Sequence, residues 1–220
     1  MITDEGLKFA YPNQQLTVTA KSKFQRRSFP DFKLVLLDSS GSMKLAPDNS
    51  MNIGNTNCIP WGDNSKYHFG LLGFYGIEHF LQQQGIAQYI QHGLSLFSST
   101  TIFKEADYSG MDSVRKLALA PEFGSTLIDA KTLEQALSGR ESFILSLSDG
   151  EVGNWASEKD KFIVLAKNNY YAHIQIGGST TFSSDLESAG IPVFPVSNGT
   201  DLSKLMVDIT KKTYDKFTKK

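Results

Sequence analysis

The sequence predicts an α/β fold: a doubly wound, mostly parallel sheet of six strands, with helices on both faces and one antiparallel edge strand. Short apolar runs alternate with longer segments of helical periodicity, which is typical of parallel strands joined by helices. The first run, Phe32–Leu37 (FKLVLL), is almost continuously apolar, as expected of a strand buried on both faces. Residues 92–106 indicate two short strands around a Ser98–Ser99 turn, and this hairpin supplies the antiparallel edge.

The remaining elements follow in chain order. The predicted strands are residues 32–37, two within 92–106, then 142–148, 172–178 and 191–197. The predicted helices are residues 67–84, 112–120, 127–137, 157–169, 184–190 and 200–217. The second helix should stop before Pro121, and Thr200 is a plausible cap for the last one. Gly70, Gly73 and Gly76 lie near one stripe of the first helix, where we expect them to allow a close approach to the sheet.

Length and charge limit the organisation of the chain. The 220 residues suit an N-terminal extended segment, residues 1–30, that flanks or packs on a single domain, residues 31–220. Lysine and arginine number 22 against 23 acidic residues, so the balance favours neither nucleic acid nor a membrane surface as a partner.

The cysteine content and the N-terminal sequence bear on the compartment. Cys58 is the lone cysteine and cannot form an internal disulfide, which fits a reducing compartment. The first residues, MITDEGLKFAYPNQQ, lack the apolar core of a signal peptide, and no run approaches the ~20 apolar residues of a membrane span. We expect a cytoplasmic protein, while a longer parent protein that is extracellular or anchored stays open.

Polar side chains with oxygen atoms should meet at one edge of this sheet. Asp38, Ser40 and Ser42 follow the first strand, Asp149 follows the strand 142–148, and Thr126 precedes a predicted helix. In open α/β sheets, the loops beyond the carboxyl ends of the strands converge and bind ligands. Two carboxylates and three hydroxyls, with no histidine or cysteine, suit a hard divalent cation: Mg²⁺ first, then Mn²⁺ or Ca²⁺. We also expect helices that start near Ser42 and Thr126 to point their positive ends at this edge.

Each element of this pattern also has an ordinary structural explanation. Ser40 could cap the next turn, Thr126 and Asp129 have the spacing of a capping box, and Asp149-Gly150 is a common turn pair. The elements together, in this order and after strands, are a far more specific signal of a metal site.

The same residues resemble the von Willebrand factor type A (vWA) domain over residues 31–217. The resemblance rests on D-x-S-x-S at Asp38–Ser42, on the distant Thr126 and on Asp149-Gly150. It implies a Rossmann-like fold, and it implies that Asp38, Ser40, Ser42, Thr126 and Asp149 form a metal ion-dependent adhesion site (MIDAS). The chain departs from the family pattern at Ser125 and Ser148, and its loop 44–65 is longer than expected.

The resemblance implies a non-enzymatic protein-binding module. In such domains the metal keeps an open position that an Asp or Glu of the partner fills. Members act as adhesion receptors outside cells and as subunits of multiprotein assemblies inside them, including partners of AAA+ ATPases. The compartment inferred above favours an intracellular subunit or adaptor.

Two alternatives are open. The first is a Mg²⁺-dependent phosphohydrolase of the haloacid dehalogenase type, which needs a second Asp where this chain has Ser40. The second is a metal-free scaffold. The Asn/Gly-rich loop 44–65 leaves directly from the metal motif, so it should border the binding face, and we expect it to be mobile without a partner.

Overall fold

The computed structural model describes residues 29–51, 59–137 and 141–218. The predicted N-terminal segment therefore lies outside the described residues except for its last two, as does Cys58. No helix in the described ranges is long and apolar enough to cross a bilayer.

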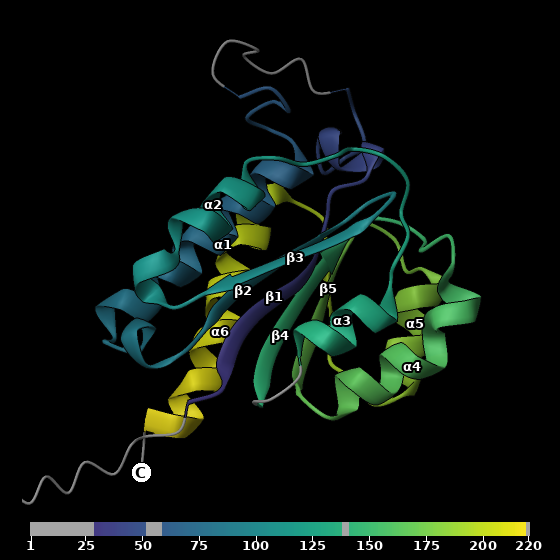
Figure 1. Ribbon diagram of the computed structural model, residues 1–220. Helices are drawn as coiled ribbons and strands as arrows, with labels where there is room; N and C mark the ends of the chain where they lie inside the picture. The colour runs from purple at the N-terminus through teal and green to yellow at the C-terminus, as the bar shows by residue number, and fades with distance from the viewer. Residues whose placement is uncertain (1–28, 52–58, 138–140, 219–220) are drawn as a thin grey trace, which may run out of the picture.

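One six-stranded sheet forms the centre of the molecule (Figure 1). Its strands are β1 (Asp31–Asp38), β2 (His92–Phe97), β3 (Thr101–Ala106), β4 (Ser142–Ser148), β5 (Tyr170–Ile176) and β6 (Val193–Val196). They lie in the order β3-β2-β1-β4-β5-β6, and every neighbouring pair is parallel except β2 with β3. The mostly parallel sheet with an antiparallel edge strand is thus confirmed. The chain moves outward from β1 to β3 and then returns to β4 beside β1, so the strand order reverses between β1 and β4.

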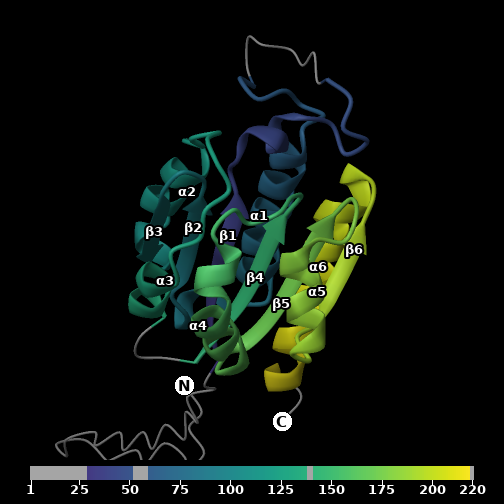
Figure 2. The same ribbon diagram turned by 90° about the vertical axis from the view of Figure 1, so that its right-hand side faces the viewer.

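Helices cover both faces of the sheet (Figures 1 and 2). One face carries three helices: α1 (Lys66–Gln83), α2 (Asp112–Ala118) and α6 (Gly199–Thr218). The other carries α3 (Ala130–Ala136), α4 (Trp155–Lys167) and α5 (Thr181–Ser188). Each set buries its own apolar cluster against the sheet, the first around Phe74 and Met206 and the second around Phe162 and Phe182. Burial on both sides explains why the parallel strands have apolar residues on both faces.

The glycines of α1 allow two different close approaches. A Cβ atom at Gly70 would lie 2.9 Å from side-chain atoms of both Leu37 and Leu147, so this glycine lets α1 pack closely on the sheet, as expected. A Cβ atom at Gly73 would collide with the Met206 sulfur of α6, and Gly76 faces α6 as well. The expectation that all three glycines face the sheet was wrong, because α6 packs along α1 on the same face.

The helix α5 begins at Thr181, three residues before its predicted start. The predicted starts of α3 and α6 were also wrong. Leu127 is held outside the helix because its N–H donates to the carbonyl of Ser98. The helix α3 begins only at Ala130, where the Asp129 carboxylate caps two backbone N–H groups. At α6 the side chain of Asn198 accepts from the Asp201 N–H, so Thr200 lies inside the helix. In both cases a carboxylate or amide close to the predicted start serves as the cap.

Candidate metal centre

Asp38 lies at the carboxyl end of β1 with no exposed surface. Its Oδ1 accepts a hydrogen bond of 2.8 Å from the Ser40 N–H, and its Oδ2 accepts one of 2.7 Å from the Ser148 hydroxyl. Ser148 is the last residue of β4. The carboxylate therefore joins the two central strands at the point where the strand order reverses.

A second chain of hydrogen bonds continues from Ser40 to Asp149. The hydroxyls of Ser40 and Ser42 lie 3.1 Å apart, and the Ser42 hydroxyl donates to Asp149 Oδ1 over 2.7 Å. A 3₁₀ turn, η1 (Gly41–Lys44), bends the chain here and buries Met43 beneath it. Ser42 is exposed, so this end of the network opens to solvent. Four of the five predicted site residues are thus brought together.

Thr126 joins the site through its backbone. The Gly41 N–H donates to the Gly124 carbonyl over 3.0 Å, and the Gly153 N–H donates to the Thr126 carbonyl over 2.7 Å. The segment containing Thr126 therefore lies between the Asp38–Ser42 loop and the loop after Asp149. Among the described residues, no hydrogen bond links the Thr126 hydroxyl to the other four side chains.

Gly124 anchors that segment to the turn between β2 and β3. Its N–H donates to the Ser98 hydroxyl over 2.7 Å, and a Cβ atom there would collide with the Ser99 hydroxyl. The turn between β2 and β3 thus holds the segment in place, a role for Ser98 and Ser99 that the sequence analysis did not find.

Lys66 is the charged residue that sequence reasoning missed. Its Nζ lies 2.6 Å from Asp149 Oδ2, and only 3% of the Lys66 side chain and 2% of the Asp149 side chain are exposed. The same Nζ donates to the Asn49 Oδ1. The partners Lys66 and Asp149 are 83 positions apart, so no local motif could indicate the pair.

The centre carries more negative than positive charge. Burial raises the pKa of Asp38 to about 6, the charge of Asp149 adds to that rise, and hydrogen bonds from Ser148 and Ser40 oppose it. Asp38 is therefore mostly ionised at neutral pH, and the ammonium of Lys66 bonds to Asp149 and not to Asp38. A further cation here would relieve the cost of the buried carboxylate.

The donor set fits a hard divalent ion, because two carboxylates and several hydroxyls offer oxygen atoms only. No group of three or more His, Cys, Asp or Glu side chains that could hold a metal occurs in the described ranges. Metal binding at this site would therefore depend on the serine hydroxyls and Thr126 as well as on the two carboxylates.

No α-helix starts at Ser42 or at Thr126, so the predicted helix dipoles do not point at the site from these positions. Ser42 lies in a 3₁₀ turn of four residues, and α3 starts four positions after Thr126. The helix that does begin at the site is α1, capped by the Ser65 hydroxyl on the His68 N–H, with Lys66 as its first residue.

The loop 44–65 leaves and returns beside the site. The Lys66 N–H donates to the Leu45 carbonyl over 2.9 Å, which brings the two ends of the loop together. Within it, Asn49 has a φ of 63° and contacts Lys66. The loop thus borders the candidate centre as expected. Residues 52–58 lie outside the described part, and the mobility of the loop stays a prediction.

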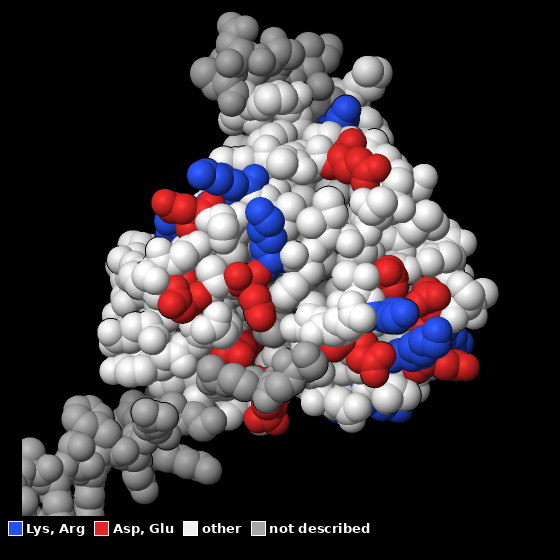
Figure 3. Space-filling view, viewed as in Figure 1, with Lys and Arg blue, Asp and Glu red and all other residues white. Residues whose placement is uncertain are grey.

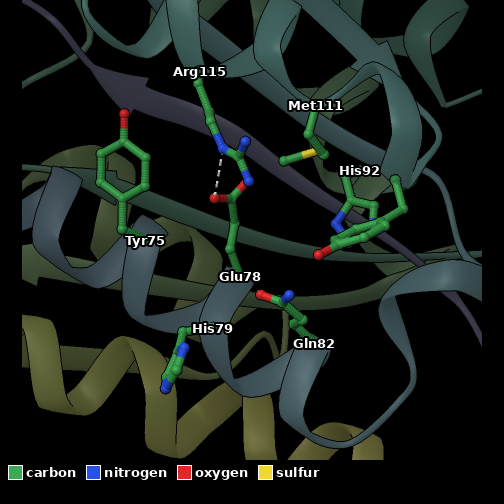
Figure 4. A pocket seen from close by; sticks show the side chains of 8 residues that line it. Tyr75, Glu78, His79, Gln82, His92, Met111 and Arg115 are labelled. Atoms are coloured by element: carbon green, nitrogen blue, oxygen red, sulfur yellow. Dashed lines mark hydrogen bonds and ion pairs between the residues drawn. The ribbon is translucent and has the colours of Figure 1, made fainter.

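A separate pocket of about 120 Å³ lies between α1, α2 and the start of β2 (Figure 4). Arg115 Nε donates to Glu78 Oε2 over 3.2 Å, while Glu78 Oε1 and His92 Nδ1 are buried without a partner among the described residues. His92 begins β2, so this pocket is near the amino ends of the strands, away from the candidate metal centre.

On the face shown in Figure 3, acidic and basic side chains are interspersed.

No family model and no curated protein sequence matches the chain. Solved structures do resemble it in fold. The pilus adhesin SpaC from Lactobacillus rhamnosus GG aligns with a TM-score of 0.62 and 16% identity over 86% of this chain and 31% of its own. The PilB minor pilin from Streptococcus sanguinis aligns with a TM-score of 0.56 and 10% identity, over 90% of this chain and 65% of its own. Proximal thread matrix protein 1 from the mussel byssus aligns with a TM-score of 0.56 and 19% identity, over 83% of this chain and 45% of its own.

These likenesses concern the fold, since the identities are low. The chain spans less than two thirds of the length of each of these three proteins.

Proposed function

We propose that the chain is a metal-dependent protein-interaction module of the vWA type, with a Rossmann-like doubly wound fold. One observation carries the proposal: Asp38, Ser40, Ser42 and Asp149 form one connected polar network where the strand order reverses. That reversal is where open α/β sheets bind their ligands. The order β3-β2-β1-β4-β5-β6 matches the strand order of doubly wound sheets.

In this proposal Mg²⁺, or else Mn²⁺ or Ca²⁺, is held by oxygens of Asp38, Ser40, Ser42, Thr126 and Asp149. When bound, the metal supplies a positive charge that attracts an anionic oxygen. The serine hydroxyls are neutral and leave part of that charge uncompensated, so a carboxylate of a partner protein is the preferred further ligand. The exposed position of Ser42 leaves the network accessible from solvent.

A non-enzymatic role agrees with the surroundings of Asp38. A phosphohydrolase of the haloacid dehalogenase type uses this residue as a nucleophile, but here both carboxylate oxygens accept hydrogen bonds and the side chain has no exposed surface. The position of the general acid is Ser40, whose hydroxyl cannot serve well in that role.

A metal-free scaffold is the second candidate, and Lys66 is the observation that favours it. The ammonium already neutralises Asp149 within the buried network. In that case the fold alone would mediate assembly, and EDTA would not affect it.

The setting of the module is part of the proposal. The lone cysteine supports an intracellular subunit or adaptor, including one that works with an AAA+ ATPase. The structural likeness to a pilus adhesin and a minor pilin supports a protein-binding role and fits a setting at the cell surface equally well. The same carboxylate-to-metal chemistry serves either setting.

Thermal melting tests the metal site. A ligand that binds only the folded state stabilises it by RT ln(1 + [L]/Kd), so millimolar Mg²⁺ or Mn²⁺ should raise the Tm of the wild type over that in EDTA. Ser42→Ala or Asp149→Ala should remove the rise. Ser157→Ala is the control, because its hydroxyl bonds locally to the Asn154 carbonyl over 2.8 Å, away from the network. An unchanged Tm of the wild type across EDTA and metal would reject the metal-dependent role and favour the scaffold.

Affinity capture tests the partner. The wild type should retain its partner in Mg²⁺ and lose it in EDTA, and Asp38→Ala should fail to retain it in either. Changing the partner's carboxylate to an amide should cost about 2–5 kcal/mol of binding free energy, because the metal is left without its anionic ligand. Affinity that survives all of these losses would show that other surfaces carry recognition.

A further inference from the structure

The ion pair between Lys66 and Asp149 is buried inside the candidate centre. Both side chains are at most 3% exposed, and Asp149 uses both oxygens: Oδ1 accepts from Ser42 and Oδ2 from Lys66. Lysine is almost never fully buried unless it is paired. The pair is therefore a built feature of the site and not a surface contact.

The position of Lys66 in its helix points to the same conclusion. It is the first residue of α1, where the positive end of the helix dipole disfavours a cation. An acidic residue would serve the helix better at this position. The placement of Lys66 is instead explained by the carboxylate that it neutralises.

The Lys66 ammonium supplies the positive charge that a metal would otherwise bring to Asp149. It is a cation at 2.6 Å from one of the two carboxylates that a divalent ion would need. A divalent ion near Asp149 would meet this positive charge at close range and be repelled by it. Removing the ammonium without adding a metal would leave two buried carboxylates, Asp38 and Asp149, with no positive partner.

We propose that Lys66 is an internal cation that competes with the divalent metal for Asp149 and thereby sets the metal affinity of the site. The inference rests on the proposed metal-dependent function. In the metal-free protein Lys66 holds the network together; when the metal binds, Lys66 releases Asp149. Asn49 shares the same ammonium, so the turn at residues 46–50 changes its contacts in the same step. Metal binding is thereby coupled to the loop that borders the binding face.

The test compares Mn²⁺ binding to the wild type and to Lys66→Gln by calorimetry, with Tm measured in EDTA and in Mn²⁺. Glutamine removes the charge and keeps N–H donors for Asp149 and Asn49. The Kd for Mn²⁺ should fall at least about tenfold, since the repulsion that is removed exceeds about 1.4 kcal/mol even in a water-like medium. The Tm of the variant should be lower than that of the wild type in EDTA, and Mn²⁺ should recover it.

The control is Lys159→Gln, which removes the ion pair of 2.7 Å between Lys159 and Asp185 and should leave the Kd unchanged. A Kd that is equal in the wild type and in Lys66→Gln overturns the inference and leaves the proposed function standing. Absence of Mn²⁺ binding in both proteins overturns the proposed function and the inference with it. Binding in the variant alone supports the inference and shows that the wild type works without metal.

The folding of Lys66→Gln provides a second test of the inference. If Lys66→Gln unfolds in EDTA, the inference requires that Mn²⁺ restore the fold, because the metal takes over the charge of the ammonium. Failure of Mn²⁺ to restore it overturns the inference. Lys66→Arg keeps the charge and should bind Mn²⁺ no better than the wild type; tighter binding would contradict charge competition.

Discussion

Replacing Asp38 with asparagine should stabilise the metal-free protein. The carboxylate is buried at the end of β1, and burial together with the charge of Asp149 raises its pKa from 3.8 to about 6. Asparagine is almost the same size and removes the charge. It can still accept from the Ser40 N–H, while its amide can donate to the Ser148 hydroxyl, which then accepts instead of donating.

The magnitude follows from the pKa. Each pKa unit corresponds to about 1.4 kcal/mol, so the rise from 3.8 to about 6 disfavours folding by about 3 kcal/mol at neutral pH. This figure already includes the opposing hydrogen bonds from Ser148 and Ser40. We therefore expect Asp38→Asn to gain up to about 3 kcal/mol in free energy of unfolding at pH 8 in EDTA.

Urea unfolding in EDTA across pH measures this difference. The folded-state pKa of Asp38 lies above its unfolded value, so the penalty is complete above about pH 6 and disappears as the pH falls toward 3.8. The advantage of Asp38→Asn should shrink over the same window. Asp160→Asn is the control, since its side chain is exposed on α4, away from the network. A variant less stable than the wild type at pH 8 would refute the reasoning and make Asp38 a stabilising structural residue.

Three further predictions concern the core and the frame of the site. Burial lowers the pKa of His173 to about 4, so its contribution to stability should fall by about 3 kcal/mol between pH 6.5 and pH 4. His173→Gln lacks the titrating ring, so its urea-unfolding stability should decline less with acid than that of the wild type; parallel pH profiles would contradict the assignment. Gly73→Ala should cost about 1–3 kcal/mol in urea unfolding because the methyl group collides with α6, whereas Gly178→Ala, with open space around it, should cost little. Gly124→Ala should weaken Mn²⁺ binding in calorimetry because it displaces the segment that carries the fifth predicted ligand; an unchanged Kd would separate that segment from the site.

The sheet was predictable because strands such as β2, β4 and β5 are buried on both faces. A parallel strand covered by helices on both sides has apolar residues at almost every position, so its apolar run marks the whole strand; β4 matches the predicted Ser142–Ser148. Helix starts were harder. Asp129 and Asn198 compete with nearby hydroxyls as caps, and only the tertiary contacts of the chain decide which side chain ends up capping.

The candidate site was predictable in part. Residues that follow parallel strands must meet at one edge, which is why Asp38, Ser42 and Asp149 could be brought together from sequence. Lys66 could not be found in this way. Its role depends on where α1 begins in space, and a lysine at the end of an Asn/Gly-rich loop usually lies on the surface.

The two ends of the described chain lie at the same end of the sheet, opposite the candidate centre (Figure 2). The Tyr214 hydroxyl of α6 donates to the Pro30 carbonyl over 2.9 Å, just before β1 begins at Asp31. The same strand, which is eight residues long, ends at Asp38. A tensile force between a partner on the centre and an attachment before residue 31 would therefore run along β1 from end to end. Since β1 is paired with β2 on one side and β4 on the other, its hydrogen bonds would be loaded together in shear instead of being opened one after another.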